Sequence, residues 1–242
     1  MFKTGQGDLD EFITEVLDNL RSKLLSLEPG QSHNLDSVTS LFVTSESKYV
    51  NSQKVMRRVT PESVIKLPLP DVEIDDTTGE PHNGPWPTVL LQELIDEAFT
   101  PVINKDASSS IRRNVVLWQH YIPSAGLAIF LINRNHDGLY YNRTSVVIPL
   151  TVSINNTKYL LKCAAIHHGG LHGGHYTAII HKTFDSIVYV NDDTVYEGAE
   201  IITVLSSKFV RSQVTSVVYE TQGQVKPSPL YVEAKKYMTE GM

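Results

Sequence analysis

The sequence has one cysteine, Cys163. A single thiol excludes an internal disulfide framework and any cysteine-rich zinc site. No apolar run approaches the ~20 residues that a membrane-spanning helix needs. The opening segment, MFKTGQGDLDEF, lacks the apolar core of a signal peptide. We therefore expect an intracellular protein, in the cytoplasm or nucleus, with no membrane partner.

Positive charge is also scarce. The 21 Lys and Arg residues are outnumbered by 27 Asp and Glu, which gives a formal net charge of −6 at pH 7. This balance argues against nucleic acid as the main partner. With 41% hydrophobic and 20% charged residues, the composition is that of a globular protein that can bury a core.

The chain begins with helical patterns and ends with strand patterns. Residues 8–27 repeat apolar side chains at the 3.6-residue period of a helix with one buried face, and a second helix is predicted at 88–99. Residues 102–110 read as an exposed connection. From 111 onward, β-branched and aromatic segments separated by turn residues predict antiparallel strands. This order indicates an α+β domain, and 221–242 is predicted to be a tail.

The part between the two helices is less regular. Short strands are predicted at 41–43 and 64–67. The proline-rich stretch 71–86, DVEIDDTTGEPHNGPW, is acidic and full of turn residues, so we expect a loop there.

The most informative segment is IHHGGLHGGHYTAII, residues 166–180. Four histidines and four glycines fall within nine of these residues, between two strand-like runs. Glycine lets the backbone reach conformations that other residues avoid and lets another chain approach closely. The pattern predicts a strand–loop–strand unit with His175 at the start of the returning strand.

Three interpretations of this segment compete. In the simplest, the histidines are polar residues of a surface loop. In the second, His168, His172 and His175 bind zinc, although the glycines spoil the spacing and no cysteine joins them. In the third, a catalytic histidine is oriented by a carboxylate or an amide.

The next strand favours the third interpretation. Residues 187–195, IVYVNDDTV, end in Asn191 and Asp192. If this strand pairs antiparallel with the one that begins at His175, Asn191 or Asp192 lies opposite that imidazole. A side-chain oxygen there could accept the ring N–H, as the third member of a thiol-protease triad does. The alternative for the NDD sequence is a turn that ends the strand.

Taken together, these segments resemble the His box of the ubiquitin-specific proteases (USP, peptidase C19), a family of cysteine deubiquitinases. That box runs from an apolar strand through His-x-Gly and Gly-His-Tyr-x-Ala to a strand that ends in Asn/Asp-Asp-x-x-Val. The matching text here is YLLKCAAIHHGGLHGGHYTAIIHK followed by IVYVNDDTV.

The resemblance implies roles for individual residues. It makes His175 the general base, Asn191 the residue that orients it, and Asp192 a supporting acid. The substrate-binding positions lie along the narrow channel for the C-terminal Gly-Gly tail of ubiquitin and are Gly173, Gly174, Tyr176 and the loop histidine His168.

Weaker matches follow in the family order. GQGDLDEFITEVLDNL is similar to the thumb helix, SVIKLPLP to the return from the fingers, and IPSAGLAIFLINR and SVVIPLTVSI to palm strands. The resemblance implies a papain-like (USP) α+β fold over residues 5–220. It consists of a partial helical thumb at 5–30, reduced fingers at 40–70 and an antiparallel palm with the His box at 111–220.

Two parts of the family pattern have no match. The Cys box, Gly-x-x-Asn-x-Gly-Asn-x-Cys, supplies the nucleophile upstream of the thumb helix, and we expect this chain to lack it. We interpret Cys163, within the apolar run KYLLKCAAI, as an inert packed residue rather than a substitute. No Cys-x-x-Cys pair occurs in LFVTSESKYVNSQKV, so we expect no structural zinc and no other cofactor.

Three functions remain open. The chain is part of a USP-class isopeptidase whose N-terminal region lies elsewhere, or it is an inactive pseudo-deubiquitinase that binds ubiquitin, a ubiquitin-like protein or another protein. The third possibility is an unrelated α+β binding protein. An incomplete thumb exposes helix surface along Phe12, Val16 and Leu20, which predicts a protein partner that covers it.

Overall fold

The computed structural model describes the chain in segments, which are residues 13, 15–16, 19, 42–50, 53–62, 64–75, 77–105, 115–121, 126–136, 138–171, 173–183, 186–191 and 194–221. They fall into two compact units. One contains 66–95 and 129–222, and the other contains 7–65 and 96–128. Sheets with a few short helices confirm the α+β class.

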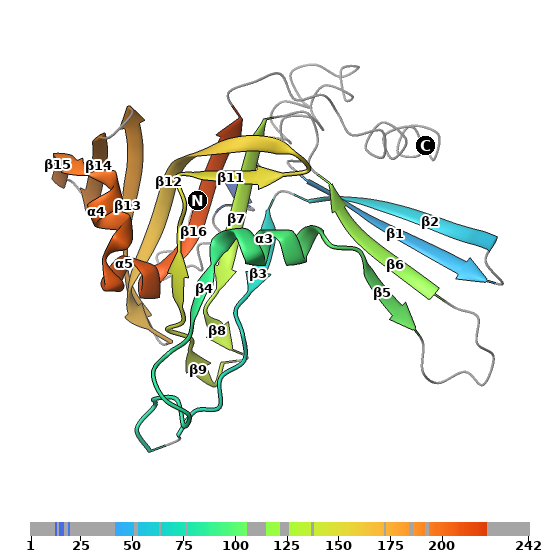
Figure 1. Cartoon of the computed structure of the whole chain (residues 1–242), viewed down its shortest axis with the longest axis horizontal. Helices are drawn as coiled ribbons and strands as arrows, with labels where there is room; N and C mark the ends of the chain where they lie inside the picture. The colour runs from blue at the N-terminus through green and yellow to red at the C-terminus, as the bar shows by residue number, and fades with distance from the viewer. Residues whose placement is uncertain are drawn as a thin grey trace. The chain divides into compact units, whose positions relative to one another are not determined.

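The first unit is built on a large sheet whose strand order is β15-β14-β13-β12-β16-β7-β3, with β11 paired to β12 (Figure 1). The strands are β3 Ile65–Pro68, β7 Leu127–Asn133, β11 Thr151–Ile154, β12 Thr157–Gly170, β13 Gly173–Thr183, β14 Ser186–Asn191, β15 Thr194–Glu200 and β16 Val214–Thr221. Pairing of β12, β13, β14 and β15 is antiparallel throughout.

The central strands bury one face. Ile166, Ile179 and Ile187 are each 1% exposed, and the strand register places them on the same side of β12, β13 and β14. Such β-branched residues suit a pleated, packed surface. This buried row extends along the sheet toward the histidine hairpin.

Short elements surround the sheet. Strand β4, Thr88–Leu90, pairs in parallel with β10, Ser145–Val147, and leads directly into helix α3, Leu91–Phe99. The predicted helix at 88–99 therefore starts three residues later. Glu93 in the first turn of α3 accepts a hydrogen bond from the Leu90 amide, as expected for an acid at a helix N-terminus.

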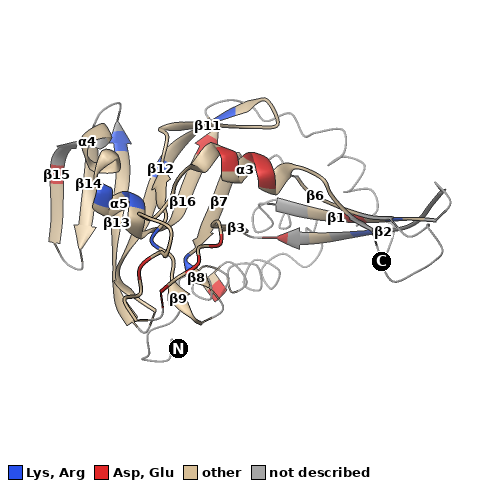
Figure 2. Cartoon of the chain, turned by 60° about the horizontal axis from the view of Figure 1, so that its bottom comes forward, with Lys and Arg blue, Asp and Glu red and all other residues tan. Residues whose placement is uncertain are grey.

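Two helices of six residues each separate β15 from β16, and the sequence patterns did not predict them. They are α4, Ile201–Ser206, and α5, Lys208–Gln213. The Ser207 hydroxyl accepts a hydrogen bond from the Val210 amide and caps α5. Figure 2 shows the basic residues of α5 and the acidic residues of α3.

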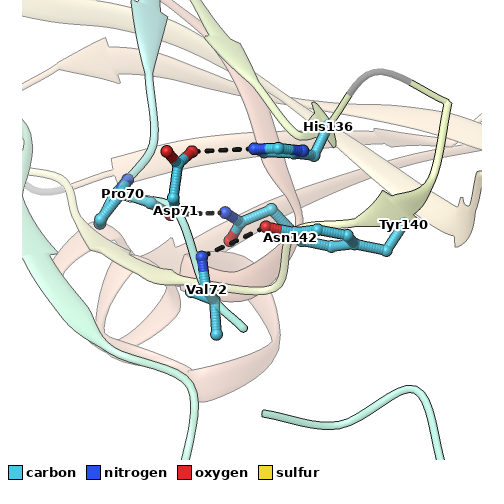
Figure 3. A network of polar contacts seen from close by, with 6 residues as sticks. All are labelled: Pro70, Asp71, Val72, His136, Tyr140 and Asn142. Atoms are coloured by element: carbon cyan, nitrogen blue, oxygen red, sulfur yellow. Dashed lines mark hydrogen bonds and ion pairs between the residues drawn. The ribbon is translucent and has the colours of Figure 1, made fainter. Parts of the chain in front are cut away.

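A polar network fastens the segment after β3 to the small hairpin of β8, Asn135–His136, and β9, Tyr140–Tyr141 (Figure 3). His136 Nε2 lies 2.8 Å from a carboxylate oxygen of Asp71, and the His136 ring stacks on Tyr140 at 4.8 Å. The buried Asn142 amide donates to the Pro70 carbonyl. The start of the predicted loop at 71–86 is thus held in place, and Ile74 pairs with Pro81 farther along it.

A buried arginine links several elements of the same unit. Arg134 is 2% exposed, and its guanidinium donates to the carbonyls of Asn142, Thr144, Arg211 and Val214. Burial lowers the pKa of Arg134 to about 10, so the group stays charged at neutral pH. Its five N–H donors fit such a ring of acceptors.

The second unit holds a four-stranded sheet in the order β2-β1-β6-β5. Its strands are β1 Phe42–Val50, β2 Gln53–Glu62, β5 Val102–Lys105 and β6 Val115–Tyr121. Three predictions differ from this result. The strand predicted at 41–43 is longer, residues 102–105 form a strand rather than a connection, and β6, expected in the palm, pairs with β1.

The predicted helix at 8–27 lies largely outside the described residues. Its four described positions, Ile13, Glu15, Val16 and Asn19, are helical, and Val16 is exposed. Phe12, Leu20 and the tail from 222 onward also lie outside them. Within the described part of the chain, no helix is both long and apolar enough to cross a membrane.

Candidate functional site

The histidine segment forms a hairpin of β12 and β13. In its register, His168 lies opposite His175, and His167 lies opposite Tyr176. Because side chains alternate along a strand, the hairpin has two chemically distinct faces. We call the one with His168 and His175 the base face and the one with His167 and Tyr176 the tyrosine face.

Strand β14 adds an amide to the base face. Its pairing with β13 places Ile179 opposite Tyr189, which puts Asn191 on the same face as His175. The side-chain Oδ1 of Asn191 lies 2.6 Å from Nε2 of His175. The expected adjacency of these two strand ends is therefore observed.

This contact defines the protonation of the ring. An amide oxygen can only accept a hydrogen bond, so Nε2 of His175 carries the proton that points at Asn191. In the neutral ring the lone pair then resides on Nδ1. Nδ1 is thus the nitrogen of His175 that can take up a proton from a reacting group.

His168 lies next to His175. Its Nε2 is 2.6 Å from the hydroxyl of Thr177, which is buried, and its ring is 5.0 Å from that of Phe209 in α5. Burial, and then the neighbouring His175, lower the pKa of His168. The resemblance implies a substrate-binding role for His168, and in the structure His168 lies opposite His175.

The tyrosine face carries a cluster of three rings. The His167 ring is 4.8 Å from that of Tyr176 and 5.5 Å from that of Tyr141 on β9. Nδ1 of His167 lies 3.3 Å from the Tyr141 hydroxyl. His167 is 7% exposed and Tyr176 is 37% exposed, so Tyr176 presents its ring to solvent over a buried imidazole.

Gly173 and Gly174, the two glycines predicted to bind substrate, differ in their surroundings. Gly173 has φ 151°, a backbone conformation that L side chains rarely adopt. A Cβ atom added to Gly174 would overlap Nε2 of His167 and lie 2.8 Å from the His168 carbonyl oxygen. The space that a side chain at residue 174 would take is therefore filled by the His167 imidazole.

The only cysteine of the sequence lies far from His175. Cys163 pairs with Ile180 on β13, five residues along β12 from His168, which corresponds to roughly 17 Å at the strand rise. Its odd register position also puts it on the tyrosine face. Burial raises the pKa of the Cys163 thiol, and a neutral thiol is a poor nucleophile.

Two of the predicted polar positions cannot be placed. Asp192 and His172 lie outside the described residues. His168 and His175, the other members of the proposed zinc set, each have Nε2 engaged with an oxygen atom. Within the described part of the chain, no three potential metal-binding side chains come together.

Comparisons with known proteins bear on this geometry. The family model described as ubiquitin carboxyl-terminal hydrolase matches residues 1–221. The chain belongs to the ubiquitin carboxyl-terminal hydrolase family. The USP-type resemblance of the sequence is thereby confirmed, and with it the papain-like fold.

Solved structures share the fold at low sequence identity. The Ubp8-Sgf11-Sgf73-Sus1 SAGA DUB module has TM-score 0.64 at 16% identity and covers 91% of this chain and 50% of its own. The Ubp8/Sgf11/Sus1/Sgf73 module bound to ubiquitin aldehyde has TM-score 0.62 at 13% identity, with coverages of 91% and 50%. An essential yeast splicing factor has TM-score 0.58 at 18% identity, with coverages of 92% and 50%.

The chain spans about half the length of these matched structures. No curated protein sequence matches it significantly. The sequence patterns did not indicate three residues that contact this site, namely His167, Thr177 and Tyr141. The alternation of side chains along a strand could have indicated that His167 and Thr177 lie on opposite faces of the hairpin. Nothing in the sequence indicates that Tyr141 lies beside it.

Proposed function

We propose that this chain supplies the base half of a thiol-dependent ubiquitin hydrolase, with His175 as general base and Asn191 as the residue that orients it. The observation that carries the proposal is the 2.6 Å contact between His175 Nε2 and Asn191 Oδ1 in a chain of this family. Asp192 is proposed as a supporting acid next to Asn191.

The chemistry follows from the tautomer. Nδ1 of His175 takes the proton of a cysteine thiol. The thiolate then attacks the carbonyl carbon of the last glycine of ubiquitin, which is bonded to an amine nitrogen of the substrate protein. The resulting imidazolium then protonates the leaving amine. Water, deprotonated by the same nitrogen, releases ubiquitin from the thioester and returns the thiol. The Asn191 amide holds the ring in place throughout.

The thiol has to come from outside these 242 residues. Cys163 is on the wrong face of the hairpin and roughly 17 Å from the base along the strand. We propose that an N-terminal region with a Cys box supplies it. Four residues of the hairpin are proposed to contact the ubiquitin tail, namely His168, Gly173, Gly174 and Tyr176.

Ubiquitin or a ubiquitin-like protein is the proposed partner, in the cytoplasm or nucleus. One structure with this fold is described as bound to ubiquitin aldehyde, which supports this choice. A second protein that covers the thumb helix around the exposed Val16 is also proposed.

The test is hydrolysis of ubiquitin linked through its C-terminus to a fluorophore, with the full-length product of the gene. We expect His175→Ala to abolish turnover and Asn191→Ala to reduce kcat by about 10²-fold or more, because a triad acts as a unit. Lys182→Ala, an exposed change on the same strand, is the control. A wild-type protein with no Cys box and no turnover would contradict hydrolysis.

The second candidate function is a ubiquitin- or protein-binding module without activity. It is favoured by the position of Cys163, and the same fold occurs in a protein described as a splicing factor. This candidate predicts that ubiquitin binds without turnover, and that His175→Ala leaves its affinity within about twofold of the wild type. Turnover that depends on His175 would rule it out.

A further inference from the structure

The strongest unexplained feature of the site is the buried imidazole of His167. It lies on the tyrosine face, opposite the face that holds the proposed acid–base pair. Yet its Nε2 occupies the position that a side chain at residue 174 would take. Gly174 is bonded directly to His175, so the ring packs against the backbone that carries the base.

The backbones of β12 and β13 approach each other closely beside this ring. A Cβ atom on Gly174 would also lie 2.9 Å from the Cα of Gly169, and one on Gly169 would overlap the Gly173 carbonyl oxygen. Glycines of β12 and β13 therefore lie opposite each other at the end of the hairpin. The His167 imidazole packs against them, and its Nδ1 lies within hydrogen-bond distance of the Tyr141 hydroxyl on β9.

We propose that His167 is a positioning residue for the base. Its imidazole fills the space beside Gly174, which holds the backbone of residue 174 in place and thereby fixes the direction of His175 toward Asn191. The proposal rests on the proposed role of the His175–Asn191 pair. The contact that matters is the packing of Nε2 of His167 beside Gly174, and not the hydrogen bond between Nδ1 and Tyr141.

The readout is the side-chain proton on Nε2 of His175, followed by NMR in the 15N-labelled 242-residue chain. A short hydrogen bond to Asn191 protects this proton from exchange with water. We expect His167→Ala to speed its exchange by about tenfold or more. His181→Ala removes another histidine of β13, one that donates to the Leu161 carbonyl, and should leave the rate unchanged.

Two conservative variants separate positioning from general stability. In His167→Gln the amide reaches toward the position of Nε2, so we expect it to restore most of the protection. In His167→Asn a polar atom remains near Nδ1, but the space beside Gly174 is empty, so we expect exchange as fast as in the alanine variant. Equal exchange rates in the Gln and Asn variants would overturn the proposal, even if His167→Ala does not fold.

A substitution at the glycine tests the same contact from the other side. Gly174→Ala should accelerate exchange less in the His167→Ala background than in the wild type, because the methyl group then meets open space on one side. Equal effects in both backgrounds would contradict the proposal. Because exchange is measured without substrate, a wild-type protein that hydrolyses nothing refutes the proposed function without changing this result.

Discussion

At the residue scale, the two faces of one hairpin separate the chemistry from the packing. His175 and Asn191 share the base face, whereas Cys163 and His167 share the other. A one-residue step along a strand reverses the face. The sequence run His167-His168 therefore places two identical side chains in unrelated roles, and neither composition nor motif distinguishes them.

The first residue-scale prediction concerns Cys163. Burial raises the pKa of its thiol, so we expect an aromatic disulfide reagent at pH 7.5 to react about tenfold or more slowly with the native chain than with the chain in urea. Cys163→Ser should leave ubiquitin affinity unchanged. Fast native labelling together with loss of binding would place the thiol at the site instead.

The second concerns alkaline pH. Burial raises the pKa of Tyr141 and of Tyr159 to about 12, so the folded chain holds these protons more tightly than the unfolded chain, whose tyrosines titrate near 10. Their contribution to stability is complete below pH 10 and is lost as the pH rises toward 12. Urea unfolding between pH 9 and 11.5 should show this decline.

Tyr141→Phe and Tyr159→Phe should each make the decline less steep, since each removes one of the linked protons. The slope they remove is at most about 1.4 kcal/mol per pH unit per tyrosine. If neither variant changes the slope, then the two hydroxyls are not buried in solution.

At the element scale, Arg134 directly follows β7 and donates a hydrogen bond to α5, which carries the Phe209 ring that contacts His168. Removal of the Arg134 side chain leaves four carbonyl oxygens without their hydrogen-bond donor. We expect Arg134→Ala to lower the free energy of unfolding by about 3 kcal/mol or more, and Arg134→Lys by nearly as much, because an ammonium cannot form the fork. Urea denaturation measures both.

The control for this change is Arg143→Ala, which removes an exposed arginine of the same unit. It should change the free energy of unfolding by less than about 0.5 kcal/mol. Similar losses for both arginines would show that charge, and not the buried hydrogen bonds of Arg134, holds α5 in place.

Elements with strong periodicity were predictable and weakly patterned ones were not. The strands around His175 are rich in β-branched residues, and β12, β13 and β14 pair as expected. Strand β2 was missed because QKVMRRVTPE lacks alternation and contains Pro61. In β1, Thr44, Ser45 and Ser47 are buried polar residues, so tertiary pairing determined the strand where polarity suggested none.

The candidate site shows the same division. The His–Gly pattern and the strand end at Asn191 are local signals, and they indicated the pair that the structure brings to 2.6 Å. The contacts of His167 with Tyr141 and of His168 with Phe209 join segments far apart in the sequence. Such contacts depend on the topology of the sheet, which a single sequence does not specify.

At the scale of the whole molecule, the chain belongs to a hydrolase family but spans about half of the structures that share its fold. What we propose that it contributes is the strand system with the His175–Asn191 pair and the surface for the ubiquitin tail. The proposed recognition of that tail by Tyr176 and the end of the hairpin does not depend on the source of a thiol. Binding can therefore be tested on these 242 residues alone.

The most direct measurement is calorimetric titration of the chain with ubiquitin and with ubiquitin that lacks its two C-terminal glycines. The account predicts measurable binding to intact ubiquitin and affinity lower by about tenfold or more for the shortened form, which is a change of about 1.4 kcal/mol. Tyr176→Ala should weaken only the binding of intact ubiquitin. Equal affinities for the two forms, or no binding to either, would contradict a site for the ubiquitin tail.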